Sequence, residues 1–307
     1  MTEALLAPRL VVILGTNASG KSGLAIHLAK LFGAEIVSAD SRQVYKGLSL
    51  CSGKVSAAEQ ADIPHHLMDL VDVGEPFSLA HYQRLAYATI DGIISRGRLP
   101  FLVGGTGLYV QSVVDGYELV DAPPDAELRA SLSAKSTEEL AEILRSVNPV
   151  TASRIELHNR RRMVRALEIH YGGFAYSTTR QKKPRYRTLQ LGVTWPAQML
   201  VERIAARLRE RLDSGMIEEV RQLANSGVPP DKIDELGLEY RHILRYLQGT
   251  YRTEDELYEN LRLAIRQFAR RQLAWFRRDK RIIWLDTMGD YLKEAEMRVR
   301  DWLTTAT

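Results

Sequence analysis

The sequence predicts an α/β fold, in which a parallel β-sheet is flanked by helices and interrupted by a helical insertion. Three observations predict it. Short apolar segments alternate with amphipathic segments through the first 105 residues, which is typical of a parallel sheet covered on both faces. The alternation ends at Asp-Ala-Pro-Pro, residues 121–124, and only helical periodicity follows as far as residue 171. An apolar strand pattern then returns at 189–195.

The first part of the chain predicts strands joined by helices. Short apolar runs predict strands at 10–14, 34–38, 66–71 and 100–103. Apolar residues spaced three and four apart predict the helices at 23–32 and 78–94. In the first of these helices we expect Leu24, Leu28 and Leu31 to share the buried face.

The second part predicts the insertion and the end of the sheet. Helical patterns cover 125–171, and a glycine-, threonine- and lysine-rich loop follows at 172–186. Beyond the returning strand we expect helices at 200–224, 239–247 and 253–276 and a last strand at 282–285. This order predicts a core domain formed by residues 1–117 and 188–307, and a helical insertion domain formed by 118–187.

The composition excludes several protein classes. Hydrophobic residues make up 45% of the 307 residues and charged residues 26%, which excludes a disordered or collagen-like chain. No apolar run approaches the ~18–20 residues that span a bilayer, so we expect no membrane association. Residues 1–8 are too short and too uncharged for a signal peptide. A single cysteine, Cys51, indicates a cytoplasmic protein, and we expect it to pack as a small apolar residue.

Positive charge is concentrated in the second part of the chain. Residues 1–130 carry 10 Lys and Arg against 14 Asp and Glu, whereas residues 131–307 carry 32 against 24. Two stretches are especially basic, with ten cations against two acids at 154–187 and eight against one at 262–281. Such stripes attract phosphate backbones, although a single stripe is as often a solvated helix face.

Residues 15–22 match the phosphate-loop pattern G-x-x-x-x-G-K-[ST]. The match lies between a predicted strand and a predicted helix, so backbone N–H groups and the helix N-terminus point at an anion. We expect Lys21 to contact the terminal phosphates and Ser22 to bind Mg²⁺. The motif indicates a P-loop NTPase-like core and a bound phosphate or diphosphate, but not ATP in particular. Its residues are Gly15, Thr16, Asn17, Ala18, Ser19, Gly20, Lys21 and Ser22.

Two other strand ends carry candidate site residues. Asp40 directly follows the strand 34–38, and a carboxylate there lies in the ligand crevice of a parallel sheet, unless it merely caps a helix. The strand 100–103 ends in Gly-Gly-Thr-Gly, which allows either a tight turn or the close approach of another molecule. The absence of a carboxylate at that second position disfavours a motor-type ATPase. Adjacent His65 and His66 lack a third ligand at metal-binding spacing, so we expect structural roles for them.

Six segments together resemble the bacterial tRNA dimethylallyltransferases. They are GTNASGKS (15–22), DSRQVYKG (40–47), PHHLMD (64–69), GGTGLY (104–109), RRMVRALE (161–168) and RRQLAWFR (270–277). The resemblance spans nearly the whole chain. It implies transfer of a dimethylallyl group from dimethylallyl diphosphate to N6 of the adenosine 3′ of the anticodon. It also implies that the insertion domain binds the anticodon stem-loop of tRNA, and we expect a monomer.

The resemblance implies roles for the residues of the site. Asp40 is the candidate base for the adenine amine, and Thr106 holds the same amine or base. Lys21, the loop N–H groups and Mg²⁺ on Ser22 would stabilise the departing diphosphate. Arg203 and Arg207, one helical turn apart, are both candidates for a further diphosphate contact, and the sequence does not choose between them.

Further residues are implied to bind tRNA. The target adenosine must be extruded from its stack, with Asp40 among the residues contacting it. Many family members have an Ile-Gly-Tyr-Lys type run where this chain has Leu-Gly-Leu-Glu-Tyr-Arg at 236–241. In this segment the resemblance therefore implies RNA contacts only for Gly237, Tyr240 and Arg241. The implied tRNA-binding residues are Asp40, Ser41, Arg42, Gln43, Thr106, Arg129, Arg161, Arg162, Met163, Val164, Arg165, Gly237, Tyr240, Arg241, Arg270, Arg271, Gln272, Trp275 and Arg277.

Two other functions compete with this interpretation. A small-molecule or nucleoside kinase would use the same phosphate loop and sheet, but it leaves both basic stripes without a role. A non-catalytic RNA-binding protein with a nucleotide switch would not need Asp40 beside a complete phosphate loop.

Overall fold

The computed structural model describes residues 7–60, 62–120, 125–174 and 182–305. Within these residues, six strands form one sheet in the order β3-β2-β4-β1-β5-β6. All neighbouring strands are parallel, so the predicted α/β class is confirmed. The strands are β1 (Arg9–Gly15), β2 (Ala34–Ser38), β3 (His65–His66), β4 (Leu99–Gly104), β5 (Arg187–Val193) and β6 (Ile282–Trp284).

Strand β1 lies at the centre of the sheet, between β4 and β5. Its side chains alternate between two cores: Leu10, Val12 and Leu14 face one, and Val11 and Ile13 face the other. This period of two is the geometry of a pleated strand buried on both faces. Strands β1, β2 and β4 all run in the same direction and therefore bring their carboxyl ends to one edge of the sheet.

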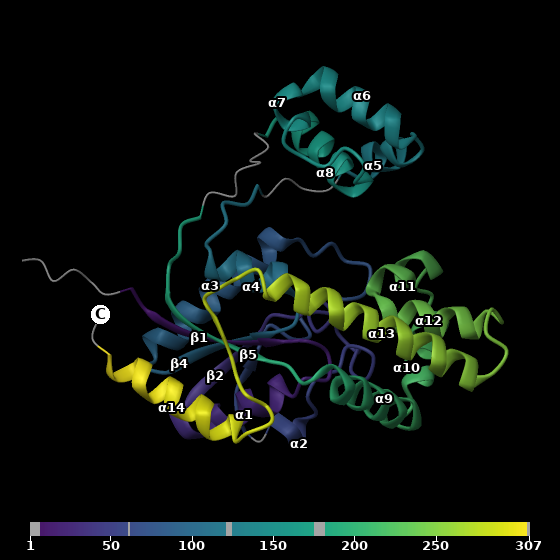
Figure 1. The fold of residues 1–307 in the computed structure, drawn as a ribbon. Coiled ribbons are helices and arrows are strands. Elements are labelled where there is room, and N and C mark those ends of the chain that lie inside the picture. The colour runs from purple at the N-terminus through teal and green to yellow at the C-terminus, as the bar shows by residue number, and fades with distance from the viewer. Residues whose placement is uncertain (1–6, 61, 121–124, 175–181, 306–307) are drawn as a thin grey trace, which may run out of the picture.

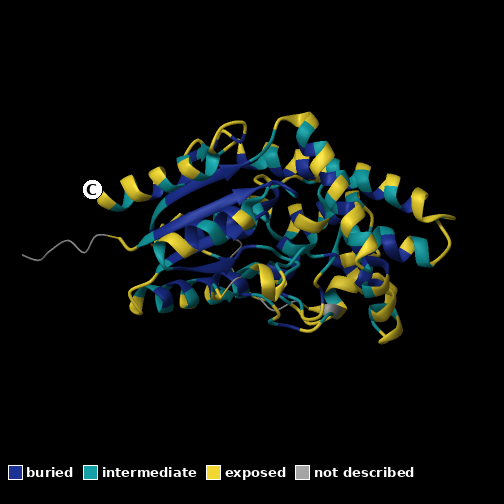
Figure 2. Ribbon diagram, turned by 90° about the horizontal axis from the view of Figure 1, so that it is seen from below, coloured by how far each residue is buried: buried dark blue, intermediate teal, exposed yellow. Residues whose placement is uncertain are grey.

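Helices cover both faces of the sheet. On one face lie α1 (Lys21–Phe32) and α14 (Tyr291–Thr304), which share a core with Val11 and Ile13. On the other lie α3 (Leu79–Ser95), α4 (Gly107–Val114) and the end of α13 (Glu254–Phe276). Figure 2 shows the buried strands between these layers, with the exposed residues on the outer helix surfaces.

A third core lies beyond the carboxyl edge of the sheet, among helices from the second part of the chain. It includes residues of α13 and of the four helices before it. These four are α9 (Ala197–Asp213), α10 (Met216–Asn225), α11 (Pro230–Leu236) and α12 (Leu238–Leu247). The same core also takes in Ala18, Leu48 and Cys51 from the sheet domain. The helical cluster therefore closes over the sheet edge where the predicted site residues lie.

The helices between β4 and β5 include a group with its own core. Helices α6 and α8 supply most of that core, and Leu132 of α5 joins it. Four side chains cap the starts of these helices: Asp125, Ser136, Asn148 and Asn159. Figure 1 shows the group set apart from the sheet. Its members are α5 (Ala126–Ser133), α6 (Thr137–Val147), α7 (Pro149–Ala152) and α8 (Arg160–Tyr171). The boundaries 118 and 187 of an insertion domain stay a prediction.

The two chain segments that lead to and from this helical group lie side by side. Tyr117 and Lys182 form an antiparallel bridge. A Cβ on Gly116 would lie 2.0 Å from the carbonyl oxygen of Lys183, so only glycine allows this approach. The buried Asp115 carboxylate pairs with Lys182 at 3.0 Å and with Arg281 at 2.7 Å. These contacts anchor both segments to the sheet domain.

Several sequence predictions need correction. The expected helix 200–224 is two helices, because the chain turns at Gly215, whose φ is +99°. The expected strand 66–71 is reduced to the two-residue strand His65–His66 and an isolated bridge between Val71 and Tyr45. Leu31 is 51% exposed, while Leu24 and Leu28 are buried as expected.

Other parts of the fold were not predicted or lie outside the description. Unpredicted helices are α2 (Ala57–Gln60), α4, α11 and α14. Residues 175–181 of the expected loop at 172–186, and the Asp-Ala-Pro-Pro boundary at 121–124, lie outside the described residues. No helix in the described part of the chain is long and apolar enough to cross a membrane.

Candidate active site

The phosphate loop joins β1 to α1, as its sequence predicts. Gly15 is fixed by crowding, because a Cβ there would lie 2.3 Å from the carbonyl oxygen of Val193. Gly20 precedes the helix with φ of +91°, a conformation that favours glycine, and Ala18 also has a positive φ of +58°. Lys21 and Ser22 then begin α1, so their side chains and the helix N-terminus lie at the carboxyl edge of the sheet.

Three side chains from distant elements hold the loop from outside. The backbone N–H of Asn17 donates to Oε1 of Gln272 at 2.9 Å. The carbonyl of Ala18 accepts from Nε of Arg203 at 3.0 Å, and that of Ser19 accepts from Nε1 of Trp195 at 2.8 Å. The carbonyl of buried Thr16 faces Nζ of Lys21 at 3.4 Å. Contacts within the protein therefore restrain the loop, which lowers the entropic cost of binding an anion.

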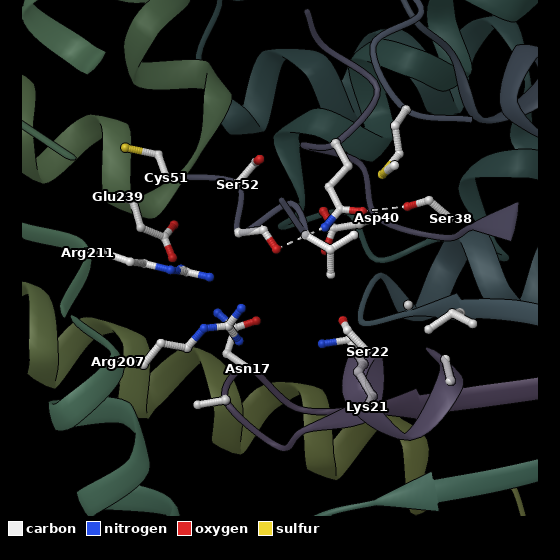
Figure 3. Close-up of a pocket in the computed structure, with 18 of the residues that line it drawn as sticks. Asn17, Lys21, Ser22, Ser38, Asp40, Cys51, Ser52, Arg207, Arg211 and Glu239 are labelled. Carbon is white, nitrogen blue, oxygen red and sulfur yellow. Dashed lines mark hydrogen bonds between the residues drawn. The ribbon is translucent and has the colours of Figure 1, made fainter. Parts of the chain in front are cut away.

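A pocket lies between the phosphate loop, the end of β2 and the helical cluster (Figure 3). Its charged and titratable lining residues come from three places in the fold. Lys21 begins α1, Asp40 follows β2, Cys51 lies between β2 and β3, and His65 belongs to β3. The others come from α9 and α12. Those other residues are Arg207, Arg211 and Glu239. The predicted residues Asn17, Ala18, Ser22 and Gln43 also line it.

The ammonium group of Lys21 is removed from water inside this pocket. Burial lowers its pKa to about 8, an effect that the carboxylate of Asp40 opposes and that Arg207 and Arg211 reinforce. An incoming diphosphate would favour the charged form, because it brings negative charge next to this cation. The environment of Lys21 is therefore one in which a bound anion would stabilise the charged form of the side chain.

Asp40 lies across the pocket from Lys21 (Figure 3). Its Oδ1 accepts from the backbone N–H of Arg42 at 2.9 Å, so the carboxylate is held in a local turn after β2. Thr106, the N-cap residue of α4, fixes the same segment: its Oγ1 accepts from the N–H of Ser41 at 3.1 Å, and its own N–H donates to the carbonyl of Ala39 at 3.2 Å. The structure therefore connects Thr106 to Asp40 through the backbone of residues 39–41, while the role of Thr106 with the substrate stays a prediction.

The glycines around Thr106 serve contacts within the protein. A Cβ on Gly104 would lie 2.1 Å from the carbonyl oxygen of Ala39, and one on Gly105 would lie 2.8 Å from Nε2 of Gln272. Gly107 packs against the indole of Trp275, which a Cβ would approach to 2.4 Å. These glycines are therefore required by packing within the protein. The sequence allowed a tight turn or the close approach of another molecule at this point, and the structure shows close approach by other parts of the same chain.

The structure separates the two candidate diphosphate arginines. Arg207 lines the pocket beside Lys21, and burial together with the charge of Arg211 lowers its pKa to about 10. Arg203 lies behind the loop, where it binds the carbonyl of Ala18 and its guanidinium lies 4.5 Å from the ring centre of Trp195. Both arginines also line a second hollow, together with Lys21 and Ser22. The geometry favours Arg207 for the pocket and Arg203 for support of the loop.

Sequence reasoning missed three residues near the pocket. Arg211 lies one further turn along α9 from Arg207, and the same spacing of four could have found it. Glu239 lines the pocket from α12. Glu219 of α10 accepts backbone N–H groups from Ser49, Leu50 and Cys51 at 2.7–3.0 Å and so fixes one pocket wall. No local signal marks Glu219, because its partners are distant in sequence.

A divalent cation fits this donor set only together with phosphate oxygens. Among the described residues, no group of three His, Cys, Asp or Glu side chains could hold a metal ion. Mg²⁺ commonly takes one or two protein ligands and completes its shell with water and substrate phosphates. Ser22 lines the pocket, and its hydroxyl is a ligand of that kind.

The segment after Asp40 is tied into the fold. Gln43 accepts from Oγ of Ser38 at 2.7 Å and donates to the carbonyl of Gly53 at 3.3 Å. Arg42 donates to the carbonyl of Glu235 at 3.2 Å and lies over Gly237, whose Cβ would come within 2.8 Å of its Nε. Arg42 and Gly237, both predicted to bind tRNA, are therefore neighbours in space.

The predicted tRNA-binding residues of the helical group differ in exposure. Arg129 and Arg165 both contact the buried carboxylate of Glu168, Arg129 at 2.8 Å and Arg165 at 3.4 Å. Arg161 is exposed, Arg162 is exposed and pairs with Glu156 at 2.7 Å, and Val164 is partly buried. Met163 is 0% exposed and belongs to the core of the group. Its side chain has no access to RNA in this structure, contrary to our expectation.

The remaining predicted RNA contacts also divide into exposed and buried residues. Arg270, Arg271 and Arg277 are exposed on or directly after α13. Arg241 pairs with Asp234 at 2.8 Å, and Trp275 packs against Gly107. Tyr240 is 0% exposed, and the amide of buried Gln272 is used by the phosphate loop and by Gly105. For these two the structure shows packing roles where we expected contacts with RNA.

Comparison with known proteins places these features in a family. The IPP transferase family model matches residues 43–279, and the isopentenyl transferase model matches residues 8–69. This chain belongs to the IPP transferase family. The match covers the segment after β2, the helical group and most of the C-terminal helices that close the pocket.

Similar members of the family are tRNA dimethylallyltransferases. The chain is 43% identical to tRNA dimethylallyltransferase 1 of Geotalea uraniireducens, over 95% of this chain and 97% of that protein. It is 41% identical to the tRNA dimethylallyltransferase of Salinispora tropica, over 96% of this chain and 93% of that one. The predicted family and the predicted enzyme class are confirmed, and the kinase alternative finds no support.

Solved structures agree over nearly the whole length. The tRNA isopentenylpyrophosphate transferase of Bacillus halodurans superposes with a TM-score of 0.71 at 35% identity, covering 96% of this chain and 95% of that one. A eukaryotic dimethylallyltransferase, whose structures capture it acting on tRNA, superposes with a TM-score of 0.83 at 25% identity. That alignment covers 97% of this chain and 80% of the eukaryotic one.

Proposed function

We propose that this protein transfers a dimethylallyl group from dimethylallyl diphosphate to N6 of the adenosine 3′ of the anticodon of tRNA. The products are N6-isopentenyladenosine and diphosphate. One observation carries the proposal beyond family membership: the phosphate loop and Asp40 line the same pocket from two sides. A diphosphate held by the loop and an adenine held at Asp40 would then meet inside it.

Asp40 acts on the nucleophile. The exocyclic amine of adenine is a poor nucleophile, because its lone pair is delocalised into the ring. As nitrogen N6 bonds to the first carbon of the allyl group, a proton leaves N6, and the Asp40 carboxylate accepts it. Thr106 orients this carboxylate by fixing the N–H of Ser41 and the carbonyl of Ala39.

Lys21 and Arg207 act on the leaving group. As the C–O bond to diphosphate breaks, its electron pair stays on the diphosphate oxygen and negative charge grows there. The two cations and the N–H groups of residues 15–22 are already in place, so they stabilise the transition state more than the ground state. Bound Mg²⁺, with Ser22 as its protein ligand, would supply further positive charge to the phosphate oxygens.

Recognition of RNA completes the proposal. Extruding the target base costs a few kcal/mol, less in a loop than in a duplex. The exposed Arg161, Arg270 and Arg277 are suited to bind the phosphates of an anticodon stem-loop and offset this cost. The helical group α5–α8 would bind the stem-loop as an insertion domain. We also propose that the protein works as a monomer in the cytoplasm, where its substrate is found.

A transfer assay tests this function. The protein is incubated with Mg²⁺, labelled dimethylallyl diphosphate and an anticodon stem-loop that has adenosine 3′ of the anticodon. We expect label to enter the RNA with the wild type and transfer to fall at least about 100-fold with Asp40→Ala. A stem-loop with guanosine at the target position is the matched control and should remain unlabelled.

Two results of the transfer assay would contradict parts of the proposal. Absence of label in any RNA, together with transfer of the γ-phosphate of ATP to a small molecule, would overturn the proposal in favour of a kinase. Full transfer by Asp40→Ala would leave the reaction standing but remove Asp40 as the base.

A further inference from the structure

The pocket contains a second carboxylate that the proposed reaction does not use. Glu239 is the second residue of α12 and lines the same pocket as Asp40. In Figure 3 its carboxylate points towards the guanidinium group of Arg211. The two side chains come from different helices, α12 and α9, so the fold and not the local sequence brings them together.

Arg211 is held against the part of the pocket wall that Gly53 forms. A Cβ on Gly53 would lie 2.0 Å from Nη2 of Arg211, so the guanidinium rests directly on this glycine. The wall itself is fixed by Glu219 through the N–H groups of residues 49–51. Arg211 therefore occupies a defined position, one helical turn from Arg207.

The charges that line the pocket are nearly balanced. Lys21, Arg207 and Arg211 are positive, and Asp40 and Glu239 are negative. Burial raises the pKa of Glu239, and the positive charges of Arg211 and Arg42 oppose this rise. His65 also lines the pocket, and burial lowers its pKa, which favours its neutral form. With Glu239 ionised, its charge offsets that of Arg211, towards which its carboxylate points.

An uncompensated Arg211 would compete with the phosphate loop for the diphosphate. It would also bind the diphosphate product more tightly and slow its release. We propose that Glu239 is a positioning residue that neutralises Arg211, so that the diphosphate stays on the phosphate loop before reaction and leaves after it. This inference rests on the proposed function, because it concerns the diphosphate of that reaction.

Binding of inorganic pyrophosphate, measured by calorimetry without RNA or prenyl donor, tests the inference. We expect Glu239→Gln to lower the Kd of pyrophosphate about tenfold, since it leaves one more positive charge beside the anion. In the transfer reaction the same variant should show pyrophosphate inhibition at correspondingly lower concentration. Glu235→Gln is the matched control: it removes the same charge from an exposed residue nearby, and the Kd should change less than twofold.

Two further variants separate charge from structure. Glu239→Asp keeps the charge and should bind pyrophosphate like the wild type, which a purely structural role would not predict. Arg211→Gln combined with Glu239→Gln restores the charge balance and should return the Kd to within about threefold of the wild type.

The results distinguish failure of this inference from failure of the proposed function. An unchanged Kd in Glu239→Gln, or the same change in Glu235→Gln, would overturn the role of Glu239 even if the wild type transfers the dimethylallyl group. A wild type that binds pyrophosphate but transfers no dimethylallyl group would overturn the proposed function instead. Melting temperatures of all variants, measured alongside, exclude unfolding as the cause of any change.

Discussion

Lys21 shows how one residue type acquires its function from its surroundings. On an exposed helix a lysine is charged throughout the physiological range. Here burial lowers its pKa to about 8, while Asp40 partly restores it. The charge that binds the diphosphate is therefore lost within an experimentally accessible pH range.

Dimethylallyl diphosphate should bind with a pH dependence set by Lys21. Below pH 8 the ammonium form predominates and KM should be nearly constant. Above pH 8 the free protein loses this proton, so KM should rise by up to about tenfold per pH unit. Steady-state kinetics between pH 7 and 9.5 measures this, and Lys21→Arg, which stays charged, should abolish the dependence. A rise of the same size in Lys21→Arg would assign the titration to another group.

The same pKa shift has a consequence for stability, with a defined sign. The unfolded chain keeps the ordinary lysine pKa of 10.5, whereas the folded protein has a value of about 8. Between these values the unfolded state binds more protons, so this lysine contributes a stability that increases with pH in that window. Below pH 8 both states are protonated, and the cost of burying the charge is fully present.

At the scale of elements, Glu168 connects two helices of the helical group. It lies on α8 with a side chain 1% exposed. It accepts a hydrogen bond from Nη2 of Arg129 of α5 at 2.9 Å, and Nε of the same arginine lies 2.8 Å from its other oxygen. Arg165 of the same helix adds a contact at 3.4 Å. The arginine side chains remain 50% and 33% exposed, so the buried acid orients two cations that still reach solvent.

Glu168→Gln should destabilise the helical group and release Arg129 and Arg165 from their present orientations. We expect the free energy of unfolding to fall by about 1–3 kcal/mol, because charge-assisted hydrogen bonds are lost but the arginines can return to water. Denaturant unfolding measures the change. Glu138→Gln, at an exposed position of α6, is the control and should lie within about 0.5 kcal/mol of the wild type. Equal stability of the two variants would contradict the bridging role.

The elements themselves were predicted where local signals are strong. The capping box of Ser136 and Glu139 and the cap at Thr253 mark helices that formed as expected. The expected single helix 200–224 failed because Gly215 interrupts an apolar pattern that continues on both sides. Helices α11 and α14 were missed: they depend on packing against α12 and against α1, and such contacts are invisible to a local window.

At the scale of the whole molecule, the basic stripes contain both cations that are paired within the protein and cations that are exposed. Lys182 and Arg281 pair with the buried Asp115 and hold the segments that lead to the helical group. Arg161, Arg270 and Arg277 are exposed, and the described residues offer them no ion pair. The net charge of a stripe therefore overstates the charge available to RNA.

The exposed arginines should determine the salt dependence of RNA binding. Each phosphate contact contributes a slope of about −0.7 in log K against log salt concentration for single-stranded RNA. Arg270→Gln combined with Arg277→Gln should therefore reduce the slope by about 1.4, measured by fluorescence anisotropy with a labelled anticodon stem-loop. Arg221→Gln is the control: this residue is exposed on α10 and pairs with Glu218, so the variant should leave the slope unchanged. Equal slopes in all three proteins would exclude α13 from the RNA-binding surface.

Local patterns in the sequence determined the α/β class, the phosphate loop, the position of Asp40 and the helical segment between two strands. Each of these depends on residues close together in the chain, such as a position where only glycine fits or a carboxylate that follows a strand. The family itself was also readable, from six short segments in order.

The tertiary structure alone decided which distant side chains meet. It placed Arg207 in the pocket and Arg203 behind the loop, and it added Arg211 and Glu239. It also buried Met163, Tyr240 and Gln272, which a motif could not distinguish from exposed neighbours. The physical reason is that burial and electrostatic environment depend on contacts between elements, and those contacts are set by the packing of whole helices and not by local sequence.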